Sequence, residues 1–412
     1  METVDVTILG GGCSGLSLAV ALAEAGPADR RIRVVEPRTT YARDRTWCFW
    51  NAVPHPFEDA IRNRWRQWAV RHGGSTVRRS AAATEYVEIP ADRFYAACRD
   101  RLDARENVEL ALGARASVIQ PTDAGHRIET TAGAFRSRLV FDGRAPRSRA
   151  VGDPIDVADP RLWQHFMGRH VRTSRAVFDP DTVTLMDFDV DASRGLHFLY
   201  VLPCSATEAL VESTYFSPRP LDPGIYERDI AAYLETRFGI TEADTQIVGE
   251  ESGCLPMFES TPKRAAPGVV PIGIAGGACR PSTGYAFLTI QRQAQRIARA
   301  LARDPALSAD ALAPLAAIDR GPVLRQMDGM LLSFLARRPE EAPILFHSLF
   351  ERADPNALAR FLMDAPRPTD LVEVVRSMPA LRFLRGVVTA GPARSRAAAS
   401  RRRARPARGR PP

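Results

Sequence analysis

The chain has 412 residues, of which 45% are hydrophobic and 25% are charged, as is typical of a soluble globular protein. Its formal net charge is +8, but eight of its 56 basic residues are arginines between Arg394 and Arg410. The other 48 balance the 48 acidic residues, so the charge of the body of the chain gives no indication of nucleic-acid binding. We expect residues 391–412 to form a disordered arginine-rich tail, because their composition cannot bury a core.

Apolar runs, the first residues and the cysteines indicate where the protein is located and which sites it lacks. We find no run of about 18 apolar residues, so no membrane-spanning helix is predicted. The start of the chain is acidic and strand-like rather than basic and then apolar, so we read no signal peptide there and expect a cytoplasmic location. The six cysteines are scattered without a C-x-x-C pair, which argues against a disulfide framework or a metal site.

Residues 5–36 read as a strand, a glycine turn, a helix and a second strand. The turn "GGGCSG" places Gly10, Gly12 and Gly15 in G-x-G-x-x-G spacing, and Glu36 ends the second strand. Such glycines let the backbone approach a pyrophosphate at the helix N-terminus, and an acid at this distance accepts hydrogen bonds from a ribose. The pattern predicts a Rossmann-like site for an adenine dinucleotide. We favour FAD over NAD because later segments of chain must reach the isoalloxazine; the alternative is a chance glycine turn.

Three short stretches carry further candidate contact residues. "RDRTWCFWN" reads as a loop in which Arg45 and Trp47 form part of the wall of a cofactor or substrate site. "VFDGRAP" reads as a strand ending in Asp142, which lies either in a second loop near the dinucleotide or in a plain surface turn. "LMDFDVDAS" has an acidic residue at every second position, which indicates a solvent-exposed face of a strand. Of these acids, we expect Asp187 to lie in the substrate pocket instead.

Residues 160–260 contain several strand candidates and read as a separate, mainly antiparallel layer. In the hairpin "GLHFLYVLPCSATEALVESTYF", alternation places Leu210, Glu212, Thr214 and Phe216 on one face. Glu212 therefore shares a face with apolar residues, where burial raises the pKa of a carboxyl group and keeps it protonated. The alternative is an edge glutamate that points to solvent. Tyr200, Thr214 and Phe216 are the candidate substrate-pocket residues of this hairpin.

The chain then returns to a strand, and "GIAGGACRPSTGYAF" leads from that strand into a long helix. Backbone N–H groups in such a turn can face the pyrophosphate or the ring of a flavin; the alternative is a glycine-rich connection without a ligand. The candidate cofactor contacts are Gly276, Gly277, Ser282, Thr283 and Gly284, and the candidate pocket residues are Tyr285 and Phe287. Residues 310–387 are helical and punctuated by prolines, and read as a packing subdomain or as a lid and membrane-docking surface.

Together these stretches resemble one family, the bacterial lycopene β-cyclases, over about residues 4–387. The resemblance rests on "GGGCSG", "DRTWCFW", "VFDGR", "MDF", "FLYVLP" with "LVESTYF", "RPSTGYAF" and "MPALRFLRG". It implies an α/β fold: a Rossmann-like FAD-binding domain in a p-hydroxybenzoate hydroxylase-like arrangement, a mainly antiparallel β substrate domain and a C-terminal helical segment. The expected parts are residues 1–150 and 265–310 for the discontinuous FAD-binding domain, 151–264 for the substrate sheet, 311–390 for the helical lid or membrane-docking segment and 391–412 for the tail.

The resemblance also implies a reaction. Reduced FAD, with NAD(P)H as the electron source, would assist protonation of an acyclic ψ-end of lycopene, ring closure and loss of a proton. The product is a β-ionone ring at an unchanged oxidation level. Glu212 matches the first acid of the family's strand motif, but the second position is Ser213, so one acid of the motif remains. Aromatic faces that would stabilise the cation, by roughly 0.5–2 kcal/mol each, are those of Tyr200, Phe216, Tyr285 and Trp47.

A carotenoid substrate lives in the bilayer, so peripheral association with the inner membrane is expected. The closest alternative is an FAD-dependent monooxygenase or reductase that acts on a polyprenoid. An alternative of another class is a nucleic-acid-binding protein that works through the arginine tail, but no aromatic residues are interleaved in residues 391–412.

Overall fold

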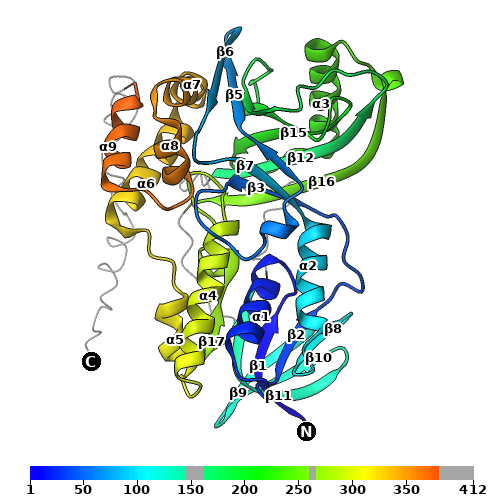
Figure 1. The fold of residues 1–412 in the computed structure, drawn as a ribbon, viewed down its shortest axis with the longest axis vertical. Coiled ribbons are helices and arrows are strands. Elements are labelled where there is room, and N and C mark those ends of the chain that lie inside the picture. The colour runs from blue at the N-terminus through cyan, green and yellow to red at the C-terminus, as the bar shows by residue number, and fades with distance from the viewer. Residues whose placement is uncertain (145–161, 259–265, 380–412) are drawn as a thin grey trace, which may run out of the picture.

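The structure, a computed structural model, describes residues 1–144, 162–258 and 266–379. The domain boundaries expected near residues 150 and 264, and the arginine-rich tail, lie outside the described residues. Figure 1 shows an elongated molecule, with one large sheet at the end that holds the N-terminus and a second large sheet at the opposite end.

The first large sheet is the Rossmann-like part. Its order is β8-β2-β1-β11-β10-β9, with β17 beside β11. β8, β2, β1, β11 and β17 run parallel, and β9 to β11 form an antiparallel meander. The strands are β1 (Thr3–Leu9), β2 (Ile32–Glu36), β8 (Val108–Leu112), β9 (Ala116–Thr122), β10 (Gly125–Thr130), β11 (Gly133–Asp142) and β17 (Val269–Pro271). The last strand comes from late in the chain, so this sheet is assembled from two separate segments.

Helix α1 lies between two other helices beside this sheet (Figure 1). It follows β1 directly, and a Cβ on Gly15 would lie 1.8 Å from the carbonyl oxygen of Gly10. Only glycine therefore allows the helix to start so close to the strand. The helices of this part are α1 (Cys13–Ala25), α2 (Ala91–Asp103), α4 (Phe287–Arg303) and α5 (Ala309–Ala316).

The second large sheet has the order β16-β12-β15-β14-β13-β5-β6 and is antiparallel except where β13 pairs with β5. The prediction of a mainly antiparallel layer is confirmed. β5 and β6 come from the part of the chain before residue 150, and local sequence gave no sign that β5 pairs with β13. The strands are β5 (Gln67–His72), β6 (Ser75–Ser80), β12 (Leu162–Thr173), β13 (Thr182–Asp187), β14 (Leu196–Pro203), β15 (Glu208–Ser217) and β16 (Thr245–Met257).

A small antiparallel sheet lies between the two large ones (Figure 1). It consists of β3 (Thr46–Trp50), β7 (Tyr86–Pro90) and β4 (Asn63–Trp65), in the order β3-β7-β4. The sequence predicted a loop over residues 43–51, and for Thr46–Trp50 that prediction is wrong. The backbone of β3 pairs along its whole length with β7, a partner that lies too far along the chain to be read from the local pattern.

Helix α3 (Pro223–Phe238) covers one face of the second sheet and was missed in the sequence. Its signals were present: Asp222 accepts a hydrogen bond from the N–H of Gly224, Pro223 opens the helix, and Gly239 closes it in the left-handed region with φ 63°. Side chains of α3 such as Ile230 pack against the sheet in a closed apolar cluster.

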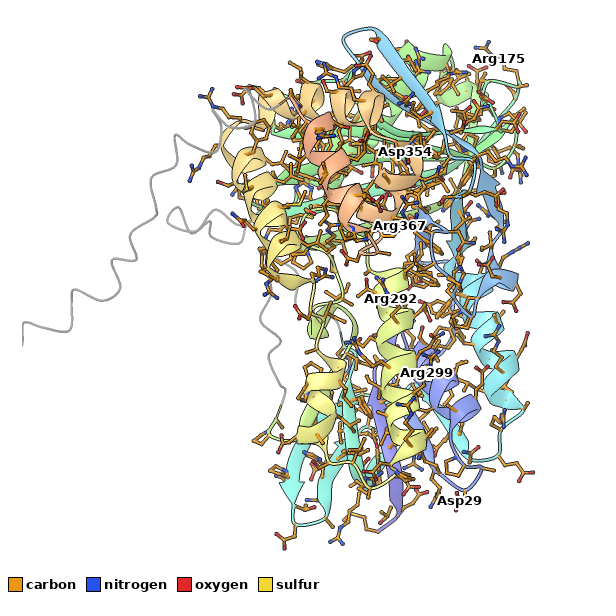
Figure 2. The ribbon with its side chains drawn as sticks, turned by 60° about the vertical axis from the view of Figure 1, so that its left-hand side comes forward. Asp29, Arg175, Arg292, Arg299, Asp354 and Arg367 are labelled. Atoms are coloured by element: carbon orange, nitrogen blue, oxygen red, sulfur yellow. The ribbon has the colours of Figure 1, made fainter. Side chains whose placement is uncertain are left out.

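The predicted helical segment is confirmed and lies beside the second sheet (Figure 1). Its helices are α6 (Gly321–Arg337), α7 (Ala342–Arg352), α8 (Pro355–Leu362) and α9 (Pro368–Ser377). Arg292, labelled on α4 in Figure 2, donates hydrogen bonds to the carbonyl oxygens of Met363 and Asp364 at 3.1 Å each. Asp354 and Arg367, also labelled, precede α8 and α9. Among the described residues, no helix is both long and apolar enough to cross a bilayer.

Candidate active site

A cavity of about 880 Å³ joins the parts of the molecule. At one end it is lined by the first glycine turn, with Gly10 and Gly12, and at the other by β15 and β16 of the second sheet. Apolar side chains of the C-terminal helices, such as Leu331, Phe346 and Phe361, close one side of it. The cavity therefore connects a turn suited to a dinucleotide with a largely apolar chamber.

The glycine turn leaves the start of α1 open to an anion. Gly12 is the N-cap, no side chain caps the helix, and its first turn has no acidic residue. The free N–H groups and the partial positive charge of this terminus suit a phosphate group. Gly10 has φ 93°, and a Cβ there would lie 3.3 Å from the backbone of Gly143 and Arg144. Glycine therefore lets the backbone of two loops meet at the cavity.

Glu36 lines the same end of the cavity, at the C-terminus of β2. Its carboxylate accepts hydrogen bonds from the Gly11 N–H at 2.6 Å and from Arg38 Nε at 2.9 Å. Burial acts to raise the pKa of Glu36, but the hydrogen bonds from Arg38 and Gly11 outweigh it and the pKa is lowered. The acid is thus ionised and fixed beside the glycine turn, with oxygens that can accept from a ribose.

The remaining cofactor candidates divide into those in the wall of the cavity and those outside it. Arg45, Ser282, Thr283 and Gly284 line the cavity, whereas Gly15, Asp142, Gly276 and Gly277 do not. The carboxylate of Asp142 accepts hydrogen bonds from Arg144, with Nε at 2.9 Å. The Ser282 hydroxyl donates to Asp328 Oδ1 at 2.7 Å, so it is engaged by α6.

Glu212 lies in the wall of the apolar chamber, on β15 with Leu210 and Phe216. Thr214, which we expected in the pocket, is buried but does not line the cavity. The side chain of Glu212 accepts a hydrogen bond from Thr214 Oγ1 at 2.6 Å. Burial raises the pKa of Glu212 to about 8; the hydrogen bond from Thr214 opposes the rise and the negative charge of Glu251 adds to it. The predicted face, its burial and the raised pKa are therefore all confirmed, and the carboxyl group carries a proton at neutral pH.

Aromatic side chains line the same cavity as this carboxyl group. Tyr200 lies directly opposite Glu212 on β14. Its hydroxyl group is 2.9 Å from that of Tyr86, which in turn is 3.2 Å from that of Tyr285. Burial raises the pKa of Tyr200 and of Tyr86 well above the ordinary value. The hydroxyl groups of Tyr200 and Tyr86 are therefore protonated and the side chains are neutral. Tyr200 and Tyr285 both line the cavity.

Trp47 and Phe287 line the cavity too, with ring centroids 5.8 Å apart. Asp187 does not line it, because its carboxylate is held by α3, where Tyr233 donates a hydrogen bond at 2.9 Å. Glu251 on β16 does line the cavity and was missed in the sequence. Glu250 beside it is exposed whereas Glu251 is buried, and two adjacent acids in the sequence do not show which of them faces the cavity.

Comparisons with known proteins identify the same family that the sequence resembles. The family model described as lycopene cyclase protein matches residues 5–387. The lycopene beta-cyclase of Pseudescherichia vulneris is 27% identical over 296 residues, which covers 69% of this chain and 70% of the relative. That of a Paracoccus species is 28% identical over 304 residues, with 69% and 70% covered.

Two solved structures illustrate the likeness of fold. A geranylgeranyl bacteriochlorophyll reductase-like protein from Thermoplasma acidophilum has a TM-score of 0.61 at 12% identity, covering 94% of this chain and 99% of that chain. A p-nitrophenol 4-monooxygenase from Pseudomonas putida has a TM-score of 0.58 at 17% identity, covering 94% and 98%. These likenesses confirm the predicted fold class.

Proposed function

The chain belongs to the lycopene cyclase family, and from this premise we propose that it is an FAD-dependent enzyme that closes an acyclic ψ-end of lycopene into a β-ionone ring. The observation that carries the proposal is the buried carboxyl group of Glu212, whose pKa burial raises to about 8, in the wall of an apolar cavity that continues to the glycine turn. The reaction is an isomerisation, because atoms and oxidation level are the same before and after.

The residues of the glycine turn fit a dinucleotide. The start of α1, with Gly10 and Gly12, would hold the pyrophosphate, and Glu36 would accept from the ribose. In its reduced form, for which NAD(P)H is the proposed electron source, FAD would supply negative charge beside the developing cation. Thr283 and Gly284 also line the cavity, in the turn over residues 273–287, which is the second glycine turn of the chain.

The chain's own residues perform the proton chemistry. The O–H bond of Glu212 breaks as a C–H bond forms at the terminal double bond of the substrate, which leaves a tertiary cation facing a carboxylate. A second double bond of the substrate attacks the cation and closes the ring, and loss of a proton restores a neutral product. The apolar wall excludes water, which would otherwise capture the cation as an alcohol. The rings of Tyr200, Phe216 and Tyr285 stabilise the cation, by roughly 0.5–2 kcal/mol each.

Glu212→Gln tests the proposal. We expect a strain that makes lycopene to form no cyclised carotene with this variant, because glutamine has no proton to give, while the purified protein keeps its flavin absorbance. Glu208→Gln is the matched control, since Glu208 on the same strand is partly exposed and paired with Arg172 at 2.7 Å. Cyclised product from the Glu212→Gln variant would remove Glu212 from the mechanism, and a product heavier by one oxygen would support the monooxygenase alternative.

We further propose that the helical segment α6–α9 is a lid that docks on the membrane surface. Its inner side chains line the apolar chamber. Val323 on α6 and Val372 and Val375 on α9 are large apolar side chains that are at least half exposed. A bilayer against these helices would let a carotenoid pass from the lipid into the cavity without crossing water.

A further inference from the structure

Glu212 and Glu251 occupy the same register on either side of strand β12. Gly168 of β12 pairs with Glu212 on β15 and with Glu251 on β16. Residues directly opposite on neighbouring antiparallel strands point to the same face of the sheet. Both carboxyl groups therefore enter the cavity from one wall, and both are more than nine-tenths buried, at 8% and 6% exposed.

Gly168 is the residue that lets these two side chains share the wall. A Cβ at this position would lie 3.5 Å from Glu212 Cβ, 3.5 Å from Glu251 Cγ and 2.8 Å from Leu210 Cδ1. The backbone of Gly168 is extended, so its torsion angles do not require glycine. Glycine is instead explained by crowding, because the side chains of Leu210, Glu212 and Glu251 already occupy the space that a Cβ would need.

The hydrogen bonds of Glu251 differ from those of Glu212. Glu251 Oε2 accepts from Thr46 Oγ1 at 2.6 Å and lies 3.2 Å from His170 Nε2. Arg43 Nη2 is 3.1 Å from the other ring nitrogen, Nδ1. A guanidinium group only donates, so Nδ1 accepts and the proton of the neutral imidazole is on Nε2, facing Glu251. Two donors thus engage Oε2, and Oε1 is the oxygen that can act on a substrate.

The family's strand motif has a second acid where this chain has Ser213, but that position faces away from the cavity. The Ser213 hydroxyl group lies 3.0 Å from His197 Nε2 and 3.1 Å from Asp229 Oδ2, beneath α3. An acid at this position of β15 would point toward α3 rather than toward a substrate beside Glu212. In this chain the second carboxyl group of the chamber comes instead from β16.

We propose that Glu251 is the proton acceptor that completes the cyclisation begun by Glu212, an inference that rests on the proposed function. Glu212 gives a proton to the terminal double bond, and the ring closes with the charge on the adjacent ring carbon. A C–H bond beside that carbon then breaks, its electron pair becomes the ring double bond, and the proton goes to Glu251 Oε1. After product release Glu251 loses this proton to water and Glu212 takes one up, so the enzyme returns to its starting state.

The test is Glu251→Gln, analysed by the type of ring as well as by the rate. A general base contributes about 10²-fold or more, so we expect cyclised product to fall by at least that factor. The residual product should contain rings with the double bond at other positions, because the cation then loses a proton from another carbon. Flavin absorbance should be unchanged, and Glu251→Asp should restore part of the rate and the β-ring. Glu250→Gln, on the outer face of β16 and paired with Arg169 at 2.8 Å, is the matched control.

The outcomes separate the two proposals. Parent-like rate and β-rings alone in the Glu251→Gln variant would overturn the role of Glu251. Loss of rate that Glu251→Asp does not restore, with β-rings as the residual product, would assign Glu251 a structural role and also overturn the inference. Absence of cyclised carotene with the parent chain and with Glu250→Gln would instead contradict the proposed function itself.

Discussion

Glu212 stays neutral in its apolar surroundings, and this protonation links stability to pH. Burial, opposed by the hydrogen bond from Thr214 and assisted by the charge of Glu251, raises the pKa of its carboxyl group from 4.5 to about 8. In the unfolded chain the group ionises near its ordinary value. Between these pH values the unfolded state binds fewer protons than the folded state, so the free energy of unfolding falls as the pH rises. The whole effect is on the order of 5 kcal/mol.

Glu212→Gln should therefore stabilise the protein while it abolishes cyclisation. Glutamine does not titrate, and its carbonyl oxygen can still accept the hydrogen bond from Thr214. We expect the thermal midpoint of the variant to exceed that of the parent, with a difference that grows from pH 5 to pH 8, measured by thermal unfolding across this range. Glu208→Gln should follow the parent. A difference that stays constant over the range would show that the Glu212 carboxyl group is not held neutral.

Local sequence was sufficient for Glu212 but not for Glu251. Alternation along one hairpin placed Glu212 on the same face of β15 as Leu210 and Phe216, which line the cavity, since period-two patterns are local. Glu251 joins the chamber only through the pairing of β15, β12 and β16, and a sequence does not show which residues of distant strands share a register. Asp187 was expected in the pocket for the converse reason, because the helix that holds it, α3, was not predicted.

At the scale of elements, strand β12 holds the two acidic strands of the chamber together. It lies between β15 and β16, and Gly168 of β12 pairs with Glu212 on one side and with Glu251 on the other. A well-packed wall of this kind has no room for an added methyl group. Helix α6, by contrast, has a glycine at residue 329 with no heavy atom within 4 Å of a Cβ built on it.

Gly168→Ala is expected to lower stability by about 1–3 kcal/mol and cyclisation by at least about tenfold, because the methyl group displaces Leu210 and both acids. Gly329→Ala is the matched substitution at an open helical site, where we expect a gain of up to about 1 kcal/mol and unchanged activity. Denaturant unfolding and carotenoid analysis of both variants measure these effects. Equal stability and activity of the two variants would contradict the crowding at Gly168.

Elements with strong local signals were predicted and those that depend on partners were not. The glycine turn before α1 and the apolar runs of β1 and β2 can be recognised from consecutive residues alone. The sequence of β3 has no regular alternation of polar and apolar residues, so it does not read as a strand. Its backbone becomes a strand through pairing with β7.

At the scale of the molecule, the helices α6–α9 are joined firmly to the cofactor side. Arg280, fully buried in the second glycine turn, donates to Asp328 of α6, with Nη2 at 2.9 Å. Arg320, just before α6, donates hydrogen bonds to the carbonyl oxygens of Gly277 at 3.1 Å and of Ala278 at 3.0 Å in the same turn. Breaking a buried ion pair such as Arg280–Asp328 costs about 3–5 kcal/mol, so the helices form a fixed cover over the chamber and present a constant outer face.

That outer face gives the prediction for membrane docking. We expect the protein to float with phospholipid vesicles, and the double variant Val372→Asp, Val375→Asp to reduce the floating fraction on the order of tenfold. Both residues are on α9 and outside the cavity wall, so activity on detergent-dispersed lycopene should persist. Val248→Asp, at an exposed position on β16, is the control. Flotation of the double variant at the parent level would place the contact with lipid elsewhere.

The order in which the chain visits the two large sheets has a consequence for its synthesis. β5 and β6 leave the ribosome as a hairpin long before β13, the other partner strand of β5, which at usual synthesis rates is a delay of roughly 5–20 s. β17 completes the first sheet only after all strands of the second have been made. The nascent chain thus holds an open hairpin edge and an unfinished sheet at the same time, both templates for misassociation. We expect the yield in a foreign host to depend on translation speed and on chaperones that bind emerging chains, more than on the equilibrium stability of the finished enzyme.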